Sequence, residues 1–176
     1  MGLIFLTGMP GAGKSAVGEQ LAGLLDWTFL DLDAEIVVRV GETIPEIFSR
    51  NGEPHFRDLE AAALKDALTT SGTVIALGAG ALERDESLAQ VTTNGTLIYL
   101  RAEIALLLER NLKVKSRPLL SAARSESDMR NQLEQLLRRR EHGYLSASVI
   151  VDVDPSQTPA MIASHILARL RRSERV

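Results

Sequence analysis

Residues 8–15, Gly8-Met9-Pro10-Gly11-Ala12-Gly13-Lys14-Ser15, match the phosphate-loop pattern G-x-x-x-x-G-K-[ST]. A short apolar run, residues 3–6, precedes them, and apolar residues at helical spacing follow them. The pattern requires this strand–loop–helix context, because its glycines bring consecutive backbone N–H groups close to a phosphate. The stretch predicts a nucleoside triphosphate site, with a purely structural glycine turn as the alternative.

The residue types in this loop predict how it would hold ATP and Mg²⁺. Lys14 can reach the β- and γ-phosphates, and the Ser15 hydroxyl can bind the metal ion. A helix that begins here adds the positive end of its dipole. We therefore expect the nucleotide to contact the loop and the start of the helix, namely Gly11, Ala12, Gly13, Lys14, Ser15 and Ala16.

The composition of the 176-residue chain is that of one soluble globular domain, residues 1–176. The net charge of −3 provides no basic field for nucleic acid or a membrane surface. Cysteine is absent, no apolar run approaches the ~20 residues of a membrane helix, and no basic segment precedes the first apolar run. We expect a cytoplasmic, monomeric protein that binds neither nucleic acid nor membranes.

Five short apolar runs alternate with helical patterns along the chain. The runs are residues 3–6, 27–30, 73–77, 97–100 and 149–151. This alternation predicts an α/β fold, a three-layer αβα sandwich in which helices cover both faces of a five-stranded parallel sheet. The helical patterns cover about 14–25, 36–48 with a break at Gly41, 54–68 after a turn at Asn51-Gly52, and segments that begin near 104, 126 and Thr158-Pro159.

Two carboxylates, Asp31 and Asp33, follow the second apolar run directly. In an open α/β sheet the ligand crevice lies outside the carboxyl ends of the strands. One carboxylate can hold Mg²⁺ through water while the other accepts the proton of a substrate hydroxyl. The alternative is that Asp33 only caps the next helix.

Three further features carry weaker signals. Gly78-Ala79-Gly80 follows the third run and predicts either close backbone approach to a ligand or a tight turn. Residues 113–125 are basic, and Pro118 bars a helix through them, which predicts a lid over phosphates or an ordinary exposed loop. By spacing alone, Arg57 and Glu60 form a surface ion pair of little energetic value.

A phosphate loop serves GTPases, ATP-driven machines and small-molecule kinases, so other motifs must discriminate between them. The sequence has no N-K-x-D or D-x-x-G motif of GTPases, and no later strand ends in the Asp-Glu pair of ATP-hydrolysing machines. Phosphoryl transfer to a small anionic metabolite fits the early carboxylates, the basic lid and the scattered arginines of this chain. Of the three arginines at 138–140, we expect at most one to be functional. A closed lid would exclude water and favour transfer over hydrolysis.

Several segments, in order along nearly the whole chain, resemble the shikimate kinase family. They are the loop at 8–15, Phe29-x-Asp31-x-Asp33, Ile47-Phe48 through Gly52-Glu53-x-x-Phe56-Arg57-x-x-Glu60, Gly78-x-Gly80, Arg117-Pro118-Leu119-Leu120 and Arg140-x-x-x-Tyr144. The resemblance implies a P-loop NTPase fold of the nucleoside monophosphate kinase type, with a substrate-binding region near 33–60 and a lid near 112–125. It also implies ATP- and Mg²⁺-dependent phosphorylation of the 3-hydroxyl of shikimate, in aromatic amino-acid synthesis.

The same resemblance implies the residues of the nucleotide side. Lys14 and the lid residue Arg117 are catalytic and contact the phosphates. Asp31 reaches Mg²⁺ through water, beside Ser15. The adenine is flanked by two further residues, Arg110 and Pro159.

On the substrate side, the resemblance implies that Asp33 binds the shikimate hydroxyls and acts as the catalytic base. Arg57, oriented by Glu60, and Arg140 would grip the carboxylate, a planar anion that suits guanidinium groups. The substrate would also lie against the small-residue loop, Gly78, Ala79 and Gly80.

The chain departs from the family pattern at Ala79, where three consecutive glycines are usual. The added methyl group would be costly if this position needs a positive φ. We expect the local backbone to tolerate it, because every charged substrate contact is retained.

Two other functions are compatible with the loop and the fold. One is a related metabolite kinase, for gluconate or for a nucleoside monophosphate, which would not need Arg57, Glu60 and Arg140 in this arrangement. The other is a non-catalytic module that binds ATP without transferring its phosphate.

Overall fold

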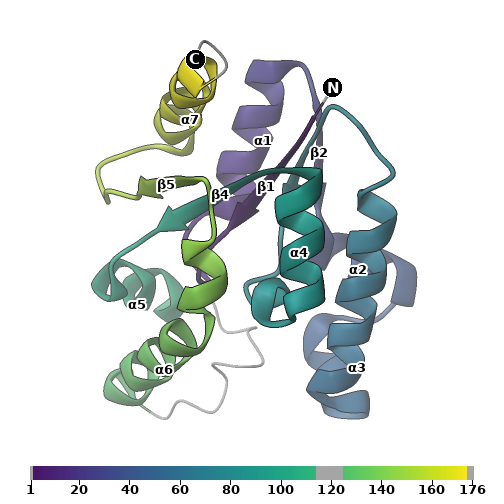
Figure 1. The fold of residues 1–176 in the computed structure, drawn as a ribbon. Helices are drawn as coiled ribbons and strands as arrows, with labels where there is room; N and C mark the ends of the chain where they lie inside the picture. Colours follow the sequence, from purple (N-terminus) through teal and green to yellow (C-terminus); the bar gives the residue numbers. More distant parts are fainter. Residues whose placement is uncertain (1, 114–124, 174–176) are drawn as a thin grey trace.

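The computed structural model describes residues 2–113 and 125–173 (Figure 1). Arg117 and most of the predicted lid therefore lie outside the described residues. Along the chain the elements are β1 (Leu3–Thr7), α1 (Lys14–Leu25), β2 (Thr28–Asp31), α2 (Leu32–Val40), α3 (Ile44–Ala67), β3 (Thr73–Ala76), the 3₁₀ turn η1 (Ala81–Glu83), α4 (Asp85–Asn94), β4 (Gly95–Arg101), α5 (Ile104–Leu112), α6 (Glu126–Leu145), β5 (Val149–Asp152) and α7 (Pro159–Ser173).

The five strands form one parallel sheet in the order β2-β3-β1-β4-β5. The central strand β1 pairs with both β3 and β4, so that Leu6 lies opposite Ala76 and Ile98. The predicted five-stranded parallel sheet is confirmed. Because parallel strands end at the same edge, the segments that follow β1, β2 and β3 come together there.

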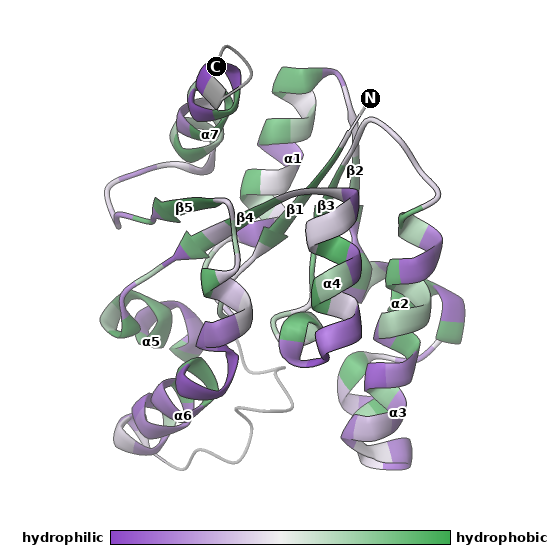
Figure 2. Cartoon of the chain, in the orientation of Figure 1, coloured by the Kyte–Doolittle hydropathy of each residue, from purple (hydrophilic) through white to green (hydrophobic). Residues whose placement is uncertain are grey.

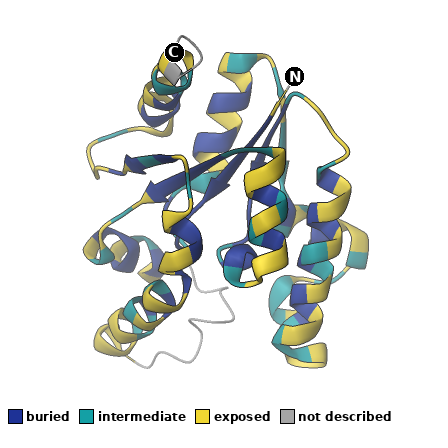
Figure 3. Cartoon of the chain, in the orientation of Figure 1, coloured by how far each residue is buried: buried dark blue, intermediate teal, exposed yellow. Residues whose placement is uncertain are grey.

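Alternate residues of β1 pack into two hydrophobic cores, one on each face of the sheet. Ile4 and Leu6 pack with α1, α5, α6 and α7, whereas Leu3 and Phe5 pack with α2, α3 and α4. Figure 2 shows hydrophobic residues along the strands and a mixture of hydrophobic and hydrophilic residues on the helices. Figure 3 shows the inner strands β1, β3 and β4 largely buried between helices with exposed outer faces, whereas the edge strand β2 is less buried. This is the three-layer αβα sandwich that the sequence predicts.

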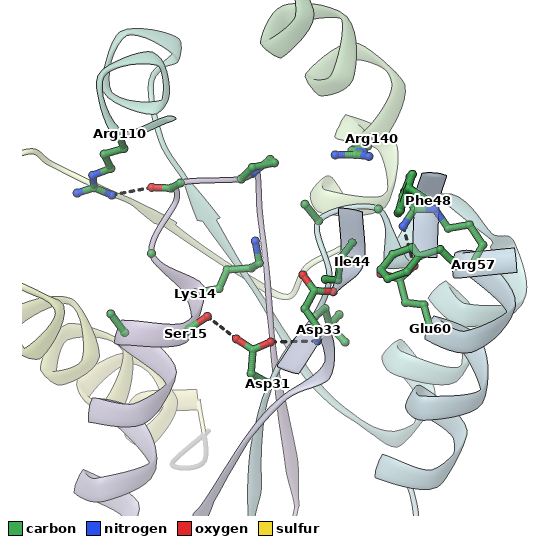
Figure 4. Close-up of a pocket in the computed structure, with 18 of the residues that line it drawn as sticks. Lys14, Ser15, Asp31, Asp33, Ile44, Phe48, Arg57, Glu60, Arg110 and Arg140 are labelled. Carbon is green, nitrogen blue, oxygen red and sulfur yellow. Dashed lines mark hydrogen bonds and ion pairs between the residues drawn. The ribbon is translucent and has the colours of Figure 1, made fainter. Parts of the chain in front are cut away.

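Helix α3 consists of two helical segments that meet at Gly52. This residue has φ 79° and ψ 172°, outside the helical region, a conformation that glycine adopts at little cost. The sequence predicts a turn at Asn51-Gly52 between two helices, and the structure confirms a break in the helix at Gly52. The second half of α3 then carries Arg57 and Glu60 along the carboxyl edge of the sheet (Figure 4).

Asp31 ends β2 and also caps α2. Its carboxylate accepts hydrogen bonds from the backbone N–H groups of Asp33 and Ala34. The alternative interpretation of Asp33 as the capping residue is therefore wrong. Asp33 lies in the first turn of α2, and the cap holds this turn in place beside the cavity described below.

The sequence patterns do not predict η1 or helix α4, which follow the small-residue loop. Their sequence, residues 81–94, contains many polar residues, although Leu82 and Val91 are buried. Within residues 2–113 and 125–173, no helix is long and apolar enough to span a membrane.

Candidate functional site

A cavity of about 540 Å³ opens at the carboxyl edge of the sheet (Figure 4). On the side of the phosphate loop it is lined by Gly11, Gly13, Lys14, Ser15, Ala16, Arg110 and Pro159. On the opposite side it is lined by Asp31, Asp33, Arg57, Glu60, Ala79, Gly80 and Arg140. The fold thus brings nearly all the described site residues that the sequence predicts to one cavity; Ala12 and Gly78 are buried beside it.

The phosphate loop takes backbone conformations that only glycine adopts readily. The φ angles of Gly8, Gly11 and Gly13 are 145°, 89° and 99°. A Cβ on Gly8 would also lie 2.6 Å from the carbonyl oxygen of Leu100. Gly13 precedes helix α1 without a side-chain cap, so no side chain covers the first N–H groups of this helix, where an anion would bind.

The Lys14 ammonium lies over this loop. Its Nζ donates hydrogen bonds to the carbonyl oxygens of Gly8 at 2.9 Å and Met9 at 3.4 Å. An ammonium in this position is within reach of phosphates held by the loop, as the pattern predicts.

Helix α5 fixes the outer side of the phosphate loop. Arg110 Nη1 donates to the carbonyl of Gly11 at 2.9 Å, and Asn111 Nδ2 donates to the carbonyl of Pro10 at 2.9 Å. In a trans peptide the N–H points away from the carbonyl, so these two bonds orient the neighbouring N–H groups away from α5. Arg110, predicted beside the adenine, thus also supports the loop.

The two predicted metal ligands lie side by side. Ser15 Oγ donates a hydrogen bond to Asp31 Oδ2 at 2.5 Å. Mg²⁺ characteristically takes one or two protein oxygens and completes its octahedron with phosphates and water. This oxygen pair fits that pattern, and the described part of the chain contains no cluster of three or more His, Cys, Asp or Glu residues that could hold a metal ion.

Two carboxylates converge on Gly78. A Cβ at this position would lie 2.0 Å from Glu60 Oε1 and 2.9 Å from Asp33 Oδ1. Because real Cβ contacts are not this short, only glycine lets α2 and α3 bring these carboxylates so near the end of β3. Gly78 is therefore needed for the close approach of two protein side chains, a reason that neither interpretation from the sequence names.

The pair Arg57–Glu60 is buried, so its interpretation as a surface ion pair is wrong. The side chains are only 10% and 4% exposed, and Arg57 Nη1 donates to Glu60 Oε2 at 2.7 Å. Arg57 Nη2 also donates to Glu53 at 2.9 Å. Breaking a buried ion pair leaves an uncompensated charge, so this one fixes Arg57 in place as the resemblance implies.

Burial acts strongly on the Glu60 carboxyl group. It raises the pKa of Glu60 from its ordinary value of 4.5 to about 7, against the opposing attraction of Arg57. The nearby Asp33 carboxylate raises this pKa further, and Arg140 lowers it. The site therefore holds an acid that titrates near neutral pH beside a permanently charged guanidinium group.

Of the three consecutive arginines on α6, one is buried. The side chains of Arg138 and Arg139 are 77% and 52% exposed, whereas that of Arg140 is 2% exposed. Arg140 Nε donates to Glu83 Oε1 at 2.7 Å. Its Nη1 and Nη2 have no hydrogen-bond partner within the described residues, and the guanidinium lines the cavity.

The loop between β3 and η1 accommodates Ala79 without strain. Ala79 is not among the described residues with positive φ, so its methyl group meets no left-handed conformation. Tyr144, a buried residue of α6, donates its hydroxyl to the Ala79 carbonyl at 2.5 Å. In contrast, a Cβ on Gly80 would lie 2.3 Å from Arg57 Nη2. The outer glycines of the loop are needed for close approach, and the middle position is not.

Three supporting residues escape the sequence analysis as members of the site. Glu83 binds Arg140, Asn111 binds the phosphate loop, and Tyr144 binds the 78–80 loop. Each contact joins elements that are distant in sequence, so spacing carries no signal for it. Two hints are available in the sequence: Tyr144 belongs to the Arg140-x-x-x-Tyr144 segment of the family resemblance, and a buried arginine requires an acidic neighbour.

Comparison with known proteins gives consistent matches over nearly the whole chain. A family model described as "Shikimate kinase" matches residues 10–171. A shikimate kinase from Chloroherpeton thalassium is 38% identical over 171 residues, which cover 95% of this chain and 90% of that protein.

Solved structures agree with the sequence matches. The structure of a shikimate kinase from Acinetobacter baumannii in complex with shikimate matches with a TM-score of 0.93 at 32% identity, covering 98% of this chain and 94% of that one. A gluconokinase from Sinorhizobium meliloti matches with a TM-score of 0.58 at 23% identity, covering 97% and 92%. The second likeness shows a shared fold alone.

Proposed function

This chain belongs to the shikimate kinase family, and we propose that it transfers the γ-phosphoryl group of ATP to the 3-hydroxyl of shikimate. The products are shikimate 3-phosphate and ADP. One observation supports this acceptor above others: Arg140 is buried, lines the cavity of the phosphate loop, and has two terminal nitrogens without a hydrogen-bond partner in the described chain. A guanidinium presented in this way suits a planar carboxylate such as that of shikimate.

The acceptor would be held by charges on opposite sides of its ring. Arg57 and Arg140 would bind the carboxylate, and Asp33 would accept hydrogen bonds from the hydroxyls. In this pose Asp33 also takes the proton of the attacking 3-hydroxyl, the role of a general base. Glu60 keeps Arg57 in place through the 2.7 Å ion pair.

The donor would be held by the phosphate loop. Backbone N–H groups of residues 11–16 bind the phosphates, and Lys14 stabilises the charge that spreads over the transferring oxygens. Ser15 and, through water, Asp31 would hold Mg²⁺, which would supply positive charge to offset that of the phosphates.

Further assignments follow from the family resemblance. Arg110 and Pro159, which line the nucleotide side of the cavity, would flank the adenine. Arg117 would contact the phosphates from the lid. We also propose that the protein works as a monomer in the cytoplasm and binds neither nucleic acid nor membranes.

A coupled assay that offers shikimate, gluconate and AMP separately tests the proposed acceptor. We expect ADP release with shikimate and background rates with the other two. Arg57→Ala should mainly raise the Michaelis constant for shikimate, because it removes a carboxylate contact. Turnover of gluconate or AMP instead of shikimate would contradict the proposal, as would nucleotide binding without any transfer.

A further inference from the structure

Glu83 ends the turn η1 and contacts three arginines. Its Oε1 lies 2.7 Å from Arg140 Nε and 3.8 Å from Arg57 Nη2, and its Oε2 lies 2.8 Å from Arg139 Nε. Neither the sequence pattern nor the proposed function assigns Glu83 a role. Its contacts nevertheless include both arginines of the proposed carboxylate clamp.

Glu83 binds one side of the Arg140 guanidinium group and leaves the other side for a ligand. A guanidinium can bind carboxylates along its Nε side or across its two terminal nitrogens. Glu83 takes the Nε position at 2.7 Å, and the terminal Nη1 and Nη2 have no partner within the described residues. A second carboxylate can therefore bind across the terminal nitrogens without displacing Glu83.

Glu83 and the bound substrate would lie against different parts of Arg140. Arg140 lines the main cavity, and Glu83 does not. Glu83 instead lines a separate cavity of about 440 Å³, together with Glu53 and Arg139. The guanidinium thus separates the supporting carboxylate from the cavity in which the substrate would bind.

The close packing of α6 on η1 makes this contact possible. A Cβ on Gly143 would lie 2.9 Å from both Cβ and the carbonyl oxygen of Leu82. Glycine at this position lets α6 approach the turn, and Arg140 lies nearly one helical turn earlier, beside Glu83. The Glu83–Arg140 contact therefore depends on the close packing of the α6 backbone against η1, and not on the chance meeting of two flexible surface side chains.

The burial of Arg140 also favours a stable ion pair with Glu83. Arg140 is 2% exposed, and a buried guanidinium needs a counterion to offset its desolvation. Although burial raises the pKa of Glu83, hydrogen bonds from Arg140 and Arg139 outweigh it and hold this pKa below its ordinary value. Glu83 consequently stays ionised at neutral pH.

We infer that Glu83 is a positioning residue that holds Arg140 by its Nε edge and so presents Nη1 and Nη2 to the carboxylate of the acceptor. This inference rests on the proposed function for the identity of the acceptor. Glu83 does not line the main cavity, so it would touch neither substrate nor nucleotide. It acts through Arg140, and its effect should fall on acceptor binding and not on the phosphoryl-transfer step.

A competing effect has the opposite sign. The negative charge of Glu83 repels the substrate carboxylate, and the cluster is already balanced, with three arginines and three glutamates: Arg57, Arg139, Arg140, Glu53, Glu60 and Glu83. If repulsion dominated, neutralising Glu83 would tighten binding. We expect positioning to dominate, because the hydrogen bond is direct whereas the repulsion acts across the guanidinium that separates the two carboxylates.

The variant Glu83→Gln tests this inference, because it keeps the shape and removes the charge. The remaining amide oxygen can still accept from Arg140, but the hydrogen bond loses its ionic component. We therefore expect the Michaelis constant for shikimate to rise about tenfold, while kcat and the Michaelis constant for ATP each change by less than about twofold. The matched control is Asp58→Asn, which breaks the nearby exposed pair Asp58–Arg84 and should leave all constants unchanged.

A substrate analogue separates positioning from general destabilisation. With the carboxamide of shikimate, which lacks the charge that Arg140 would bind, Glu83→Gln should lower kcat/KM by less than about twofold. In an Arg140→Ala background it should also have little further effect. An equal loss with both acceptors, or an unchanged or lower Michaelis constant for shikimate, would overturn the inference.

A measurement without turnover keeps the inference separate from the proposed function. The Nε–H proton of Arg140 should exchange slowly with water in the wild type and several-fold faster in Glu83→Gln, as followed by NMR. Failure of the wild type to phosphorylate shikimate would overturn the proposed function, and the exchange rates would then decide the Glu83–Arg140 contact on their own. Equal exchange rates in the two proteins would refute that contact.

Discussion

The two halves of the cavity are built in different ways. The proposed donor half is a continuous stretch, Gly8 to Ser15, whose backbone conformation and N–H groups would bind the phosphates. The acceptor half consists of side chains from α2, α3, the β3–η1 loop and α6 (Figure 4). In one half the glycines shape the backbone, and in the other they make room for buried charges.

This difference determines how each half responds to change. Substitutions other than proline leave the backbone N–H groups in place, so the donor half depends on a few residues such as Lys14 and the glycines. The acceptor half depends on ion pairs that support one another, Arg57 with Glu60 and Arg140 with Glu83. We therefore expect changes in the donor half to act on transfer, and changes in the acceptor half to act on substrate binding and on stability.

The largest effect is expected for Lys14→Ala. Removing a donor aimed at charge that develops in the transition state should lower kcat about 10²–10³-fold, while shikimate binding in the acceptor half stays nearly unchanged. Steady-state kinetics with both substrates varied would measure this. Lys65→Ala, an exposed lysine on α3, is the control and should behave as the wild type. A main effect on the Michaelis constant for shikimate would remove the distinction between the halves.

The next effect concerns the pH dependence of stability in the acceptor half. The pKa of Glu60 is about 7 in the folded protein against an ordinary 4.5, so the folded state binds an additional proton between these values. The free energy of unfolding should therefore fall as the pH rises through this window. Glu60→Gln lacks this titration, and its stability relative to the wild type should increase by roughly 3 kcal/mol from pH 4.5 to pH 7.

Urea unfolding at a series of pH values would measure this difference. The exposed residue Glu86 on α4 provides the control, since Glu86→Gln should keep the slope of the wild type. Parallel stability curves for the wild type and Glu60→Gln would show that burial does not raise the pKa of Glu60.

A smaller effect is expected for Gly80→Ala. The new Cβ would lie 2.3 Å from Arg57 Nη2 and would push the guanidinium aside. We expect the Michaelis constant for shikimate to rise about tenfold, in line with the 1–3 kcal/mol typical of overpacking, with kcat much less affected. A constant equal to that of the wild type would mean that Arg57 moves without loss, and that the acceptor half is less rigid than its ion pairs indicate.

The smallest effect is expected for Ala79→Gly, which restores the usual family residue next to Gly80. Because Ala79 has an ordinary φ, its replacement should change the Michaelis constant for shikimate by less than about twofold and lower stability by less than about 1 kcal/mol. Kinetics and thermal unfolding of this variant beside Gly80→Ala form a matched pair. A large gain in shikimate affinity would show that the methyl group obstructs the substrate.

Sequence patterns predict the donor half better than the acceptor half. The loop, the five strands and the positions of Asp31 and Asp33 follow from local spacing, because each depends on neighbours within a few residues. Spacing alone misplaces Arg57 and Glu60 on the surface, since burial of a helix face depends on what packs against it. Family resemblance corrects this interpretation, although it assigns nothing to Glu83.

The sequence by itself therefore determined the alternation of strands and helices and the loop that would bind ATP. Both are encoded by short-range preferences: glycine where φ is positive, and apolar residues at the period of each element. Only the tertiary structure decided that Ala79 is tolerated, that Arg57 and Arg140 are buried, and that Glu83 holds Arg140. These facts depend on packing between elements distant in the chain, where one missing Cβ, at Gly78, Gly80 or Gly143, sets how closely charges and backbones approach.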